Sequence, residues 1–302
     1  MAIDYAKVLI NMQIPIIVVG RGLNSAQNFE KMTNLPVITG GLNNWLSISK
    51  EFPLYAIVAV GIDELCNTTY ALLKKGFKNI LLEKPGGLNY NEIKFLSKKA
   101  RKFNSRVLIA YNRRFYSSVI EAKKLIKEDG GIKSYFFEFT EWSHIIENLD
   151  KRPEIKKNWL LANSSHVIDL AFYLGGPPKV ISCYKEGKLE WHPDGCVFTG
   201  AGISEGGSLF SYIANWDAPG RWSVEVMTQN NRLIFKPLEK LKIQKKASVE
   251  INEVKLDDEI DTKFKPGLYR QVKAFLNNDY LEFLDIHQQV SCLNFYKKIL
   301  NG

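Results

Sequence analysis

The chain has 302 residues, of which 45% are hydrophobic and 24% are charged, and this composition predicts a folded globular protein large enough for two domains. The net charge of +9 comes mostly from lysines on expected helix surfaces without any known nucleic-acid module, so a nucleic-acid-binding protein is the least favoured class. No apolar run is long enough to span a bilayer, and residues 1–13 lack the features of a secretory signal, so we expect a cytoplasmic protein without membrane contacts.

The cysteines are scattered over the chain and form no C-x-x-C pair. The pattern predicts neither a zinc site nor a disulfide framework, and we expect no other metal site. Free thiols in a reducing compartment are the simplest interpretation. The cysteines are Cys66, Cys183, Cys196 and Cys292.

The first hundred residues alternate between short apolar runs and helix-like segments. Such alternation is typical of strands joined by crossover helices in a parallel sheet. It predicts a doubly wound dinucleotide-binding Rossmann domain over residues 1–115. The expected strands are 14–19, 36–39, 55–60, 79–82 and 106–111, and the expected helices are 25–32, 63–75 and 91–103.

A glycine turn, Gly20-Arg21-Gly22, follows the first expected strand and leads into a helix. It approximates the G-x-G-x-x-G motif, with Ser25 at the third glycine position, and this placement favours a pyrophosphate site at the helix N-terminus. An ordinary tight turn is the alternative. The cofactor contacts predicted in this domain are Gly20, Arg21, Gly22, Leu23, Asn24, Ser25, Thr39, Val60, Gly61, Glu83 and Lys84.

The end of the second expected strand, at Thr39-Gly40-Gly41, lacks the carboxylate that usually binds the ribose hydroxyls of NAD. The site therefore predicts NAD or NADP, with NADP favoured because no negative charge would repel a 2′-phosphate. Arg21 is the nearby cation that would bind that phosphate. A site that has lost cofactor binding is the alternative.

Strands dominate the second half, where they follow one another with short connections. This pattern predicts an α+β domain over residues 116–302, with a large, mostly antiparallel open sheet. Helices would cover one face, and the other face would pair with another subunit. The expected strands are 132–142, 180–185, 197–204, 208–216, 221–229 and 232–235, and the expected helices are 117–127, 159–174, 268–277 and 286–300.

Three segments carry more specific information. Glu83-Lys84-Pro85 follows a strand and precedes two glycines and an amphipathic helix; Tyr111-Asn112-Arg113-Arg114-Phe115 ends the next strand; and Ser164-Ser165-His166-Val167-Ile168-Asp169 leads to a Gly-Pro turn. With them the sequence resembles the Gfo/Idh/MocA oxidoreductases over nearly its whole length. These proteins pair an N-terminal Rossmann domain with a C-terminal open-sheet domain.

The resemblance implies an NAD(P)-dependent oxidoreductase that transfers a hydride to or from a sugar, a nucleotide sugar or a cyclic polyol. Lys84 would hydrogen-bond the reacting oxygen, and His166 would donate or accept the proton, a role that suits histidine near neutral pH. A homodimer or homotetramer through the C-terminal sheet is also implied. The further contacts are Asn112 and Arg114 for the cofactor, and Lys84, Tyr111, Asn163, His166 and Asp169 for the substrate.

The sequence departs from the family pattern next to His166. Relatives that oxidise polyols often carry an aspartate four residues before the histidine, and this chain has Ala162 there. A non-catalytic dinucleotide-binding relative, acting as a sensor or partner subunit, is therefore the alternative function. In that interpretation Lys84 is a surface lysine, His166 is a structural helix residue and Asp169 only braces its helix.

Overall fold

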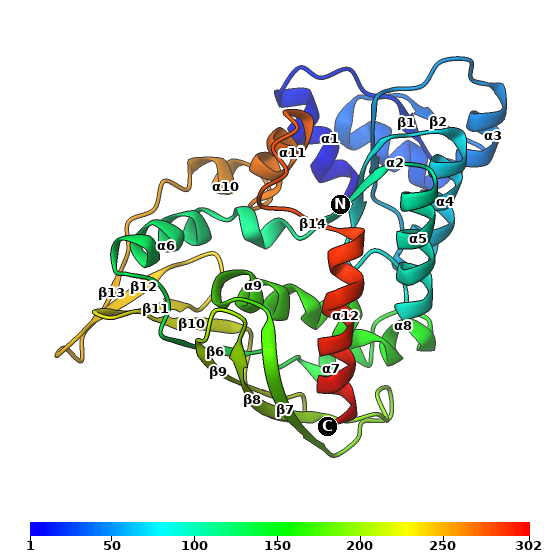
Figure 1. The fold of residues 1–302 in the computed structure, drawn as a ribbon. Helices are drawn as coiled ribbons and strands as arrows, with labels where there is room; N and C mark the ends of the chain where they lie inside the picture. Colours follow the sequence, from blue (N-terminus) through cyan, green and yellow to red (C-terminus); the bar gives the residue numbers. More distant parts are fainter. The chain divides into compact units, whose positions relative to one another are not determined.

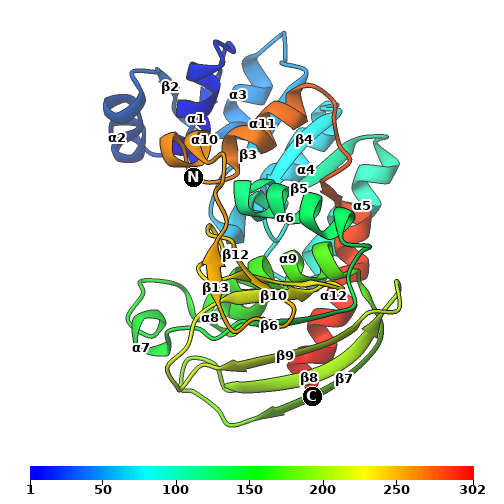
Figure 2. The same ribbon diagram turned by 90° about the vertical axis from the view of Figure 1, so that its left-hand side faces the viewer.

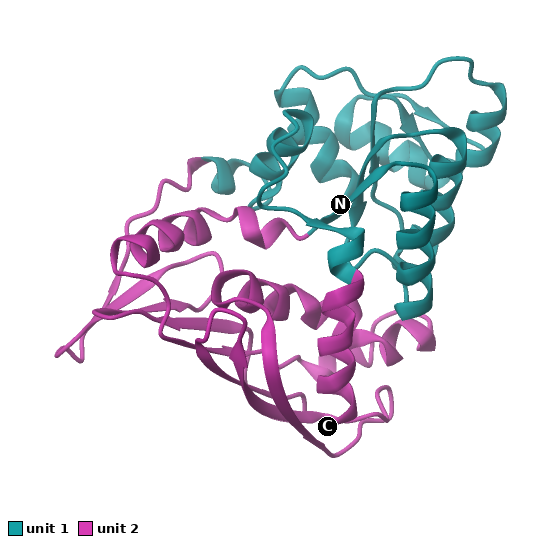
Figure 3. Ribbon diagram, viewed as in Figure 1, with its two compact units in different colours: residues 1–110, 260–289 teal, residues 111–259, 290–302 magenta.

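The structure is a computed structural model that describes residues 1–302, the whole chain. It divides into two compact units (Figure 3), with unit 1 formed by residues 1–110 and 260–289 and unit 2 by residues 111–259 and 290–302. The predicted boundaries, 1–115 and 116–302, stay predictions, although residues 260–289, expected in the second domain, pack within unit 1. None of the helices combines the length and the apolar character that crossing a membrane requires.

The main sheet of unit 1 has the strand order β14-β5-β4-β3. Figure 1 labels β14, and Figure 2 labels the other three strands. Its three long strands are parallel, and β14 adds to β5 in the antiparallel direction. The centre of β4 is fully buried, as its continuous apolar run predicts. The strands are β3 (Tyr55–Val58), β4 (Asn79–Glu83), β5 (Arg106–Ala110) and β14 (Leu284–Asp285).

A second, separate pair of strands completes unit 1. β1 (Val18–Val19) and β2 (Val37–Ile38) are parallel and are joined through α2 (Leu23–Thr33). β1 has only β2 as a hydrogen-bonded neighbour, and β3 has only β4. The strand expected over 14–19 is only two residues long, because its pairing with β2 is limited to Val18 and Val19.

In unit 1 the sequence did not predict α3 (Leu42–Ile48), α10 (Glu259–Lys263) or α1 (Ala2–Asn11), the last of which buries Tyr5, Ala6 and Val8. α5 (Tyr90–Lys102) agrees with its amphipathic pattern and is capped by Asn89, whose side chain accepts hydrogen bonds from two backbone N–H groups of the first turn. The other helices are α4 (Leu65–Lys75) and α11 (Leu268–Leu276), together with the start of α12 (Ile286–Asn301) and a short 3₁₀ helix (Ile62–Glu64).

Unit 2 is built on an eight-stranded sheet in the order β13-β12-β11-β10-β6-β9-β8-β7 (Figure 2). All neighbours are antiparallel except β6 and β9, which are parallel. The strands are β6 (Ser134–Glu138), β7 (Pro178–Glu186), β8 (Val197–Ser204), β9 (Leu209–Asn215), β10 (Ser223–Met227), β11 (Asn231–Phe235), β12 (Lys242–Lys245) and β13 (Ile251–Glu253).

Helix α9 (Ser165–Gly175) covers one face of this sheet, against β6 and β10. The core beneath it is aromatic, with Phe137 stacked on Tyr212 at 5.4 Å and edge-on to Phe172 at 5.5 Å between ring centroids. The parallel sheet and the large, mostly antiparallel sheet confirm the predicted fold class. The remaining helices are α6 (Ser117–Glu128), α7 (Ser143–Ile146) and α8 (Pro153–Lys157), with a 3₁₀ turn (Asn112–Phe115) and a π-helical turn (Leu160–Ser164).

Candidate functional site

The glycine turn of unit 1 lies where the prediction placed it, between β1 and α2. Gly22 is the N-cap of α2, no side chain caps this end, and the first turn contains no acidic residue. Ser25 hydrogen-bonds back to the Gly22 carbonyl at 2.9 Å. Backbone N–H groups at such a helix end bind phosphate, so the turn fits the pyrophosphate of a dinucleotide. Leu23 and Asn24 are exposed in the same first turn.

Arg21, the residue expected to bind the 2′-phosphate of NADP, forms an ion pair with a carboxylate. Its Nη1 lies 2.9 Å from Oε1 of Glu64, and both side chains have substantial exposure. The backbone of Gly20 bridges to the end of β2, because its N–H donates to Ile38 and its carbonyl accepts from Gly41. Arg21 therefore stands beside the end of β2, one residue past which lies Thr39, but Glu64 competes with any phosphate for its charge.

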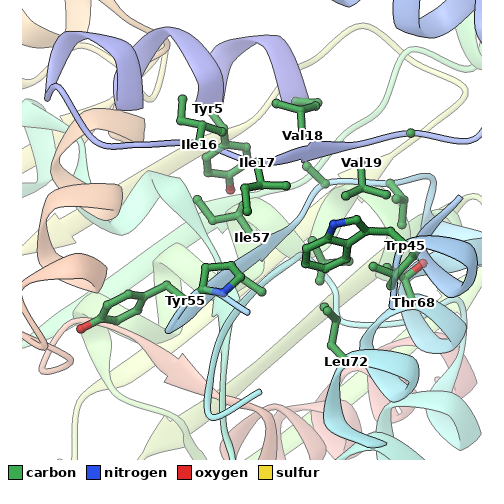
Figure 4. Close-up of a pocket in the computed structure, with 18 of the residues that line it drawn as sticks. Tyr5, Ile16, Ile17, Val18, Val19, Trp45, Tyr55, Ile57, Thr68 and Leu72 are labelled. Atoms are coloured by element: carbon green, nitrogen blue, oxygen red, sulfur yellow. The ribbon is translucent and has the colours of Figure 1, made fainter. Parts of the chain in front are cut away.

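A cavity of about 620 Å³ opens in unit 1 between β1 and β3 (Figure 4). Its lining includes Gly20, Arg21, Glu64 and residues 40–43, together with Val60, two residues beyond the end of β3. The adjacent Gly61 leads into the short helix that contains Glu64. In doubly wound sheets ligands bind at the carboxyl ends of strands where the strand order reverses. The turn after β1 and the end of β3 meet this description.

The Glu83-Lys84-Pro85 segment lies at the carboxyl end of β4 and accepts two hydrogen bonds from distant parts of the chain. Tyr5 of α1 donates a hydrogen bond to Glu83 at 2.8 Å, and Gln289 donates to the Pro85 carbonyl at 2.9 Å. Burial raises the pKa of the Glu83 carboxyl, whereas the bond from Tyr5 and the charge of Lys84 oppose the rise. Lys84 is half-buried at this strand end, so its ammonium is held by a rigid segment.

In unit 2, His166 lies in the first turn of α9 in an aromatic setting. Its ring centroid is 6.2 Å from that of the buried Tyr111, and 6.0 Å from that of Trp222. Trp222 also stacks against two guanidinium groups, those of Arg113 at 4.9 Å and Arg221 at 4.6 Å. The half-buried imidazole therefore lies against two aromatic rings, and one of these rings, that of Trp222, also contacts two guanidinium groups.

Two residues that were predicted to contact the cofactor and the substrate bind each other. Arg114 and Asp169 form a bidentate pair, with Nε to Oδ2 at 2.8 Å and Nη2 to Oδ1 at 2.6 Å, and both are buried. The Asp169 carboxylate raises the pKa of Arg114, although burial acts against it. The pair joins the turn that contains the buried Asn112 to α9, one turn after His166.

A buried carboxylate that the sequence did not single out, Glu141, lies next to the start of α9. It accepts hydrogen bonds from Asn163 at 3.0 Å and from Ser164 at 2.7 Å, and its other oxygen is 3.1 Å from Nη1 of Arg221. Burial raises the pKa of Glu141, and these donors counteract the rise. Asn163 is thus a link between Glu141 and the π-helical turn that leads into His166.

Comparison with known proteins agrees with this geometry, although no protein-family model matches the chain. In sequence, the chain is similar to trans-1,2-dihydrobenzene-1,2-diol dehydrogenase of Xenopus laevis, with 27% identity over 126 residues, which are 41% of this chain and only 37% of that protein. In structure, it is similar to levoglucosan dehydrogenase in complex with NADH and levoglucosan, with a TM-score of 0.75 and 16% identity over 99% of this chain and 92% of the other.

An inositol dehydrogenase homologue from Azotobacter vinelandii, complexed with NAD+, is similar to the same degree, with a TM-score of 0.75 and 15% identity over 99% of this chain and 90% of the other. The chain has the fold of the Gfo/Idh/MocA oxidoreductases. The resemblance found in the sequence is thereby confirmed at the level of the fold.

Within this Gfo/Idh/MocA fold, the predicted catalytic residues belong to different compact units, Lys84 to unit 1 and His166 to unit 2. The sequence patterns did not indicate three residues that contact the predicted site residues: Tyr5, Glu64 and Glu141. Each acts through a partner at least 22 residues away in the chain, and none stands in a recognisable motif. No local signal in the sequence reports such long-range pairs.

Proposed function

We propose that the protein is an NAD(P)-dependent oxidoreductase that transfers a hydride to or from a sugar, a nucleotide sugar or a cyclic polyol. The observation that carries the proposal is the rigid Glu83-Lys84-Pro85 segment at the carboxyl end of a central parallel strand, where such folds bind ligands. The names of the similar proteins support the substrate class, since one is a levoglucosan dehydrogenase in complex with levoglucosan and the other is an inositol dehydrogenase homologue.

In this proposal the N-terminus of α2 and the turn at Gly20-Arg21-Gly22 bind the phosphates of the dinucleotide. When bound, the nicotinamide would supply or accept the hydride. Lys84 hydrogen-bonds the reacting oxygen of the substrate, and His166 takes up or returns the hydroxyl proton.

The remaining predicted residues are given positioning roles. Glu141 and Asn163 fix the turn before His166, and the pair of Arg114 and Asp169 fixes its helix. Tyr111 packs against the imidazole ring edge-on. The carboxylate of Glu141 thus braces the helix in a chain that has Ala162 where relatives often have aspartate.

The proposal includes either NAD or NADP as cofactor. The compared structures contain NAD+ or NADH, and they lend no support to the preference for NADP. In favour of NADP stands Arg21, the cation beside the end of β2, and against it stands the ion pair with Glu64. Arg21→Ala should weaken NADPH binding more than NADH binding if Arg21 contacts the 2′-phosphate.

The experiment is a fluorescence titration of the purified protein with NADH and NADPH, followed by turnover assays on a panel of sugars, nucleotide sugars and inositols. Lys84→Ala and His166→Ala should each lower kcat by about 100-fold or more while leaving the dinucleotide affinity nearly unchanged. The matched controls are Lys98→Ala and His144→Ala, two exposed positions. Failure to bind both dinucleotides, or full activity in the two site variants, would contradict the proposal.

A non-catalytic dinucleotide-binding protein, acting as a sensor or partner subunit, is the second candidate, and Ala162 is the observation that favours it. Cofactor binding without turnover on any substrate of the panel would support it. Robust turnover of a single substrate would exclude it.

We also propose that unit 2 self-associates through the open face of its sheet, as a homodimer or homotetramer. Val180, Ile203 and Leu209 are register partners across β7, β8 and β9, and their exposed fractions are 54%, 40% and 59%. Such a row of exposed apolar side chains is typical of a protein interface. Light scattering should show an oligomer that Leu209→Lys dissociates, whereas Lys242→Ala, on β12, should leave it intact.

A further inference from the structure

Two arginines of unit 2 contact the same indole ring. The guanidinium carbons of Arg113 and Arg221 lie 4.9 Å and 4.6 Å from the ring centroid of Trp222. The ring centroid of His166 lies 6.0 Å from that of Trp222. Two positive groups thus share one aromatic neighbour with the residue that the proposed function assigns to proton transfer.

Two N–H groups of these side chains are buried without an acceptor. They are Nε of Arg113 and Nε1 of Trp222, a residue that is only 7% exposed. Buried polar groups in folded proteins are nearly always hydrogen-bonded, so two unpaired donors next to each other need an explanation. Because a guanidinium and an indole N–H can only donate, the group that would satisfy them is a hydrogen-bond acceptor.

The charge of Arg113 also lacks a counter-ion. Burial lowers the pKa of its guanidinium and the charge of Arg221 acts in the same direction, whereas Tyr116, Glu239 and Glu141 oppose the change. Neither carboxylate forms an ion pair with Arg113. Glu239 accepts a hydrogen bond from Tyr116 at 3.4 Å, and Glu141 accepts hydrogen bonds from the π-helical turn and from Arg221. The missing acceptor is therefore best supplied by a negatively charged group.

Arg221 is held in place and is accessible at the same time. Its guanidinium carbon lies 4.6 Å from the ring centroids of both Trp142 and Trp222, and its Nη1 is 3.1 Å from Oε2 of Glu141. Its side chain is nevertheless 40% exposed, so a ligand can reach it from solvent. A guanidinium fixed by packing loses little conformational freedom on binding, which favours its contact with a carboxylate or a phosphate.

We propose that Arg113, Arg221 and the indole N–H of Trp222 form an anion subsite, which binds a carboxylate or phosphate group of the substrate. The inference rests on the proposed function, because that function places the reacting hydroxyl at His166. It narrows the substrate class to acidic sugars, phosphorylated sugars and nucleotide sugars, and it disfavours neutral sugars and polyols. Carboxylate and phosphate oxygens accept hydrogen bonds and carry negative charge, so one group satisfies the buried donors and compensates the charge of Arg113.

An anion fits these residues better than a neutral hydroxyl or a purely structural role. A hydroxyl oxygen could accept a hydrogen bond from Nε of Arg113, but it would leave the buried charge without compensation. A purely structural stack on Trp222 accounts for the cation–π contacts, but it leaves Nε and Nε1 without acceptors. A charged acceptor accounts for both observations.

The test is isothermal titration calorimetry of the whole chain, without dinucleotide and with NAD+, in a buffer free of phosphate and carboxylates. The first probe pair is glucuronate and glucuronamide, which differ in charge but hardly in shape, and the second is glucose 6-phosphate and glucose. In at least one pair the anionic sugar should bind at least about tenfold more tightly than its neutral partner. The pair that shows this preference identifies the anion as a carboxylate or a phosphate. Absence of a preference in both pairs would overturn the proposal.

Variants locate the preference. Arg113→Met keeps the length of the side chain but removes its charge, and it should reduce the preference to about twofold or less, whereas Arg113→Lys should retain part of it. The control is Arg232→Met, at an exposed arginine of the same unit, which should leave the preference unchanged. If Arg113→Met does not fold, Arg221→Met at the more exposed position decides. A preference that persists in the variant would overturn the proposal.

The outcome can be separated from that of the proposed function. A preference for anionic sugars without any turnover would contradict the enzymatic function but support the anion subsite. Turnover of neutral sugars or inositols without a preference for anions would overturn the subsite and leave the function intact. A large loss of NADH affinity in Arg113→Met would mean that the dinucleotide supplies the anion, and this too would overturn the proposal.

Discussion

Replacing Asp169 by alanine tests the most deeply buried ion pair of unit 2. The carboxylate is 2% exposed and makes two hydrogen bonds, at 2.8 and 2.6 Å, to an Arg114 side chain that is 9% exposed. Removing it leaves the guanidinium buried without its counter-charge, so we expect a loss of about 3–5 kcal/mol in the free energy of unfolding. That is a large fraction of the stability of an ordinary domain, about 5–15 kcal/mol.

The assay is urea denaturation followed by far-ultraviolet circular dichroism at neutral pH. The double variant Arg114→Leu/Asp169→Leu should be less destabilised than Asp169→Ala, because it removes both charges and leaves apolar groups of similar size. A loss below about 1 kcal/mol in Asp169→Ala, the value typical of exposed pairs, would refute the reasoning. A double variant that loses the sum of the two single losses would refute it as well.

Three further predictions follow from local geometry. Hydrogen bonds from the β10–β11 hairpin, the Thr228 hydroxyl first, lower the pKa of Asp129 from 3.8 to about 2. The contribution of this carboxylate to stability is therefore present above pH ~4 and is lost as the pH falls towards ~2. The difference in urea midpoint between wild type and Asp129→Asn should shrink over that range. Gly86→Ala should cost more than about 1 kcal/mol in the same denaturation assay, because φ is +98° and the new Cβ would lie 2.9 Å from Ile109. Tyr5→Phe should cost about 1–3 kcal/mol, since the buried Glu83 loses its donor; no change in the urea midpoint would contradict this.

The sequence predicted those elements whose signal is local. The helix expected over 91–103 is found as α5 (Tyr90–Lys102), because apolar residues at helical spacing and the Asn89 cap lie within one segment. The strand expected over 197–204 agrees with β8 to the residue. In both, short-range patterning is sufficient because burial of one face decides the structure.

The features that the sequence did not predict depend on contacts between distant segments of the chain. α1 was not predicted, and its role depends on packing against α11 and on the bond from Tyr5 to Glu83, 78 residues away. The site stays a prediction from its motifs, and those motifs did not indicate the mutual pairing of Arg114 and Asp169 or the contacts of Glu141 with Asn163. Such pairs arise only when the topology brings two strand ends or helices together.

Residues 260–289 return to unit 1, and this has a practical consequence for dissecting the protein. The chain passes from one unit to the other three times, and the last passage occurs inside α12, between Gln289 and Val290. Truncation after residue 110 would therefore remove α11 and β14 from unit 1 and would not yield that unit intact. A single-chain unit 1 requires residue 110 to be joined to residue 260 by a linker, and a protease that cuts once between the units would leave both still connected through the rest of the backbone.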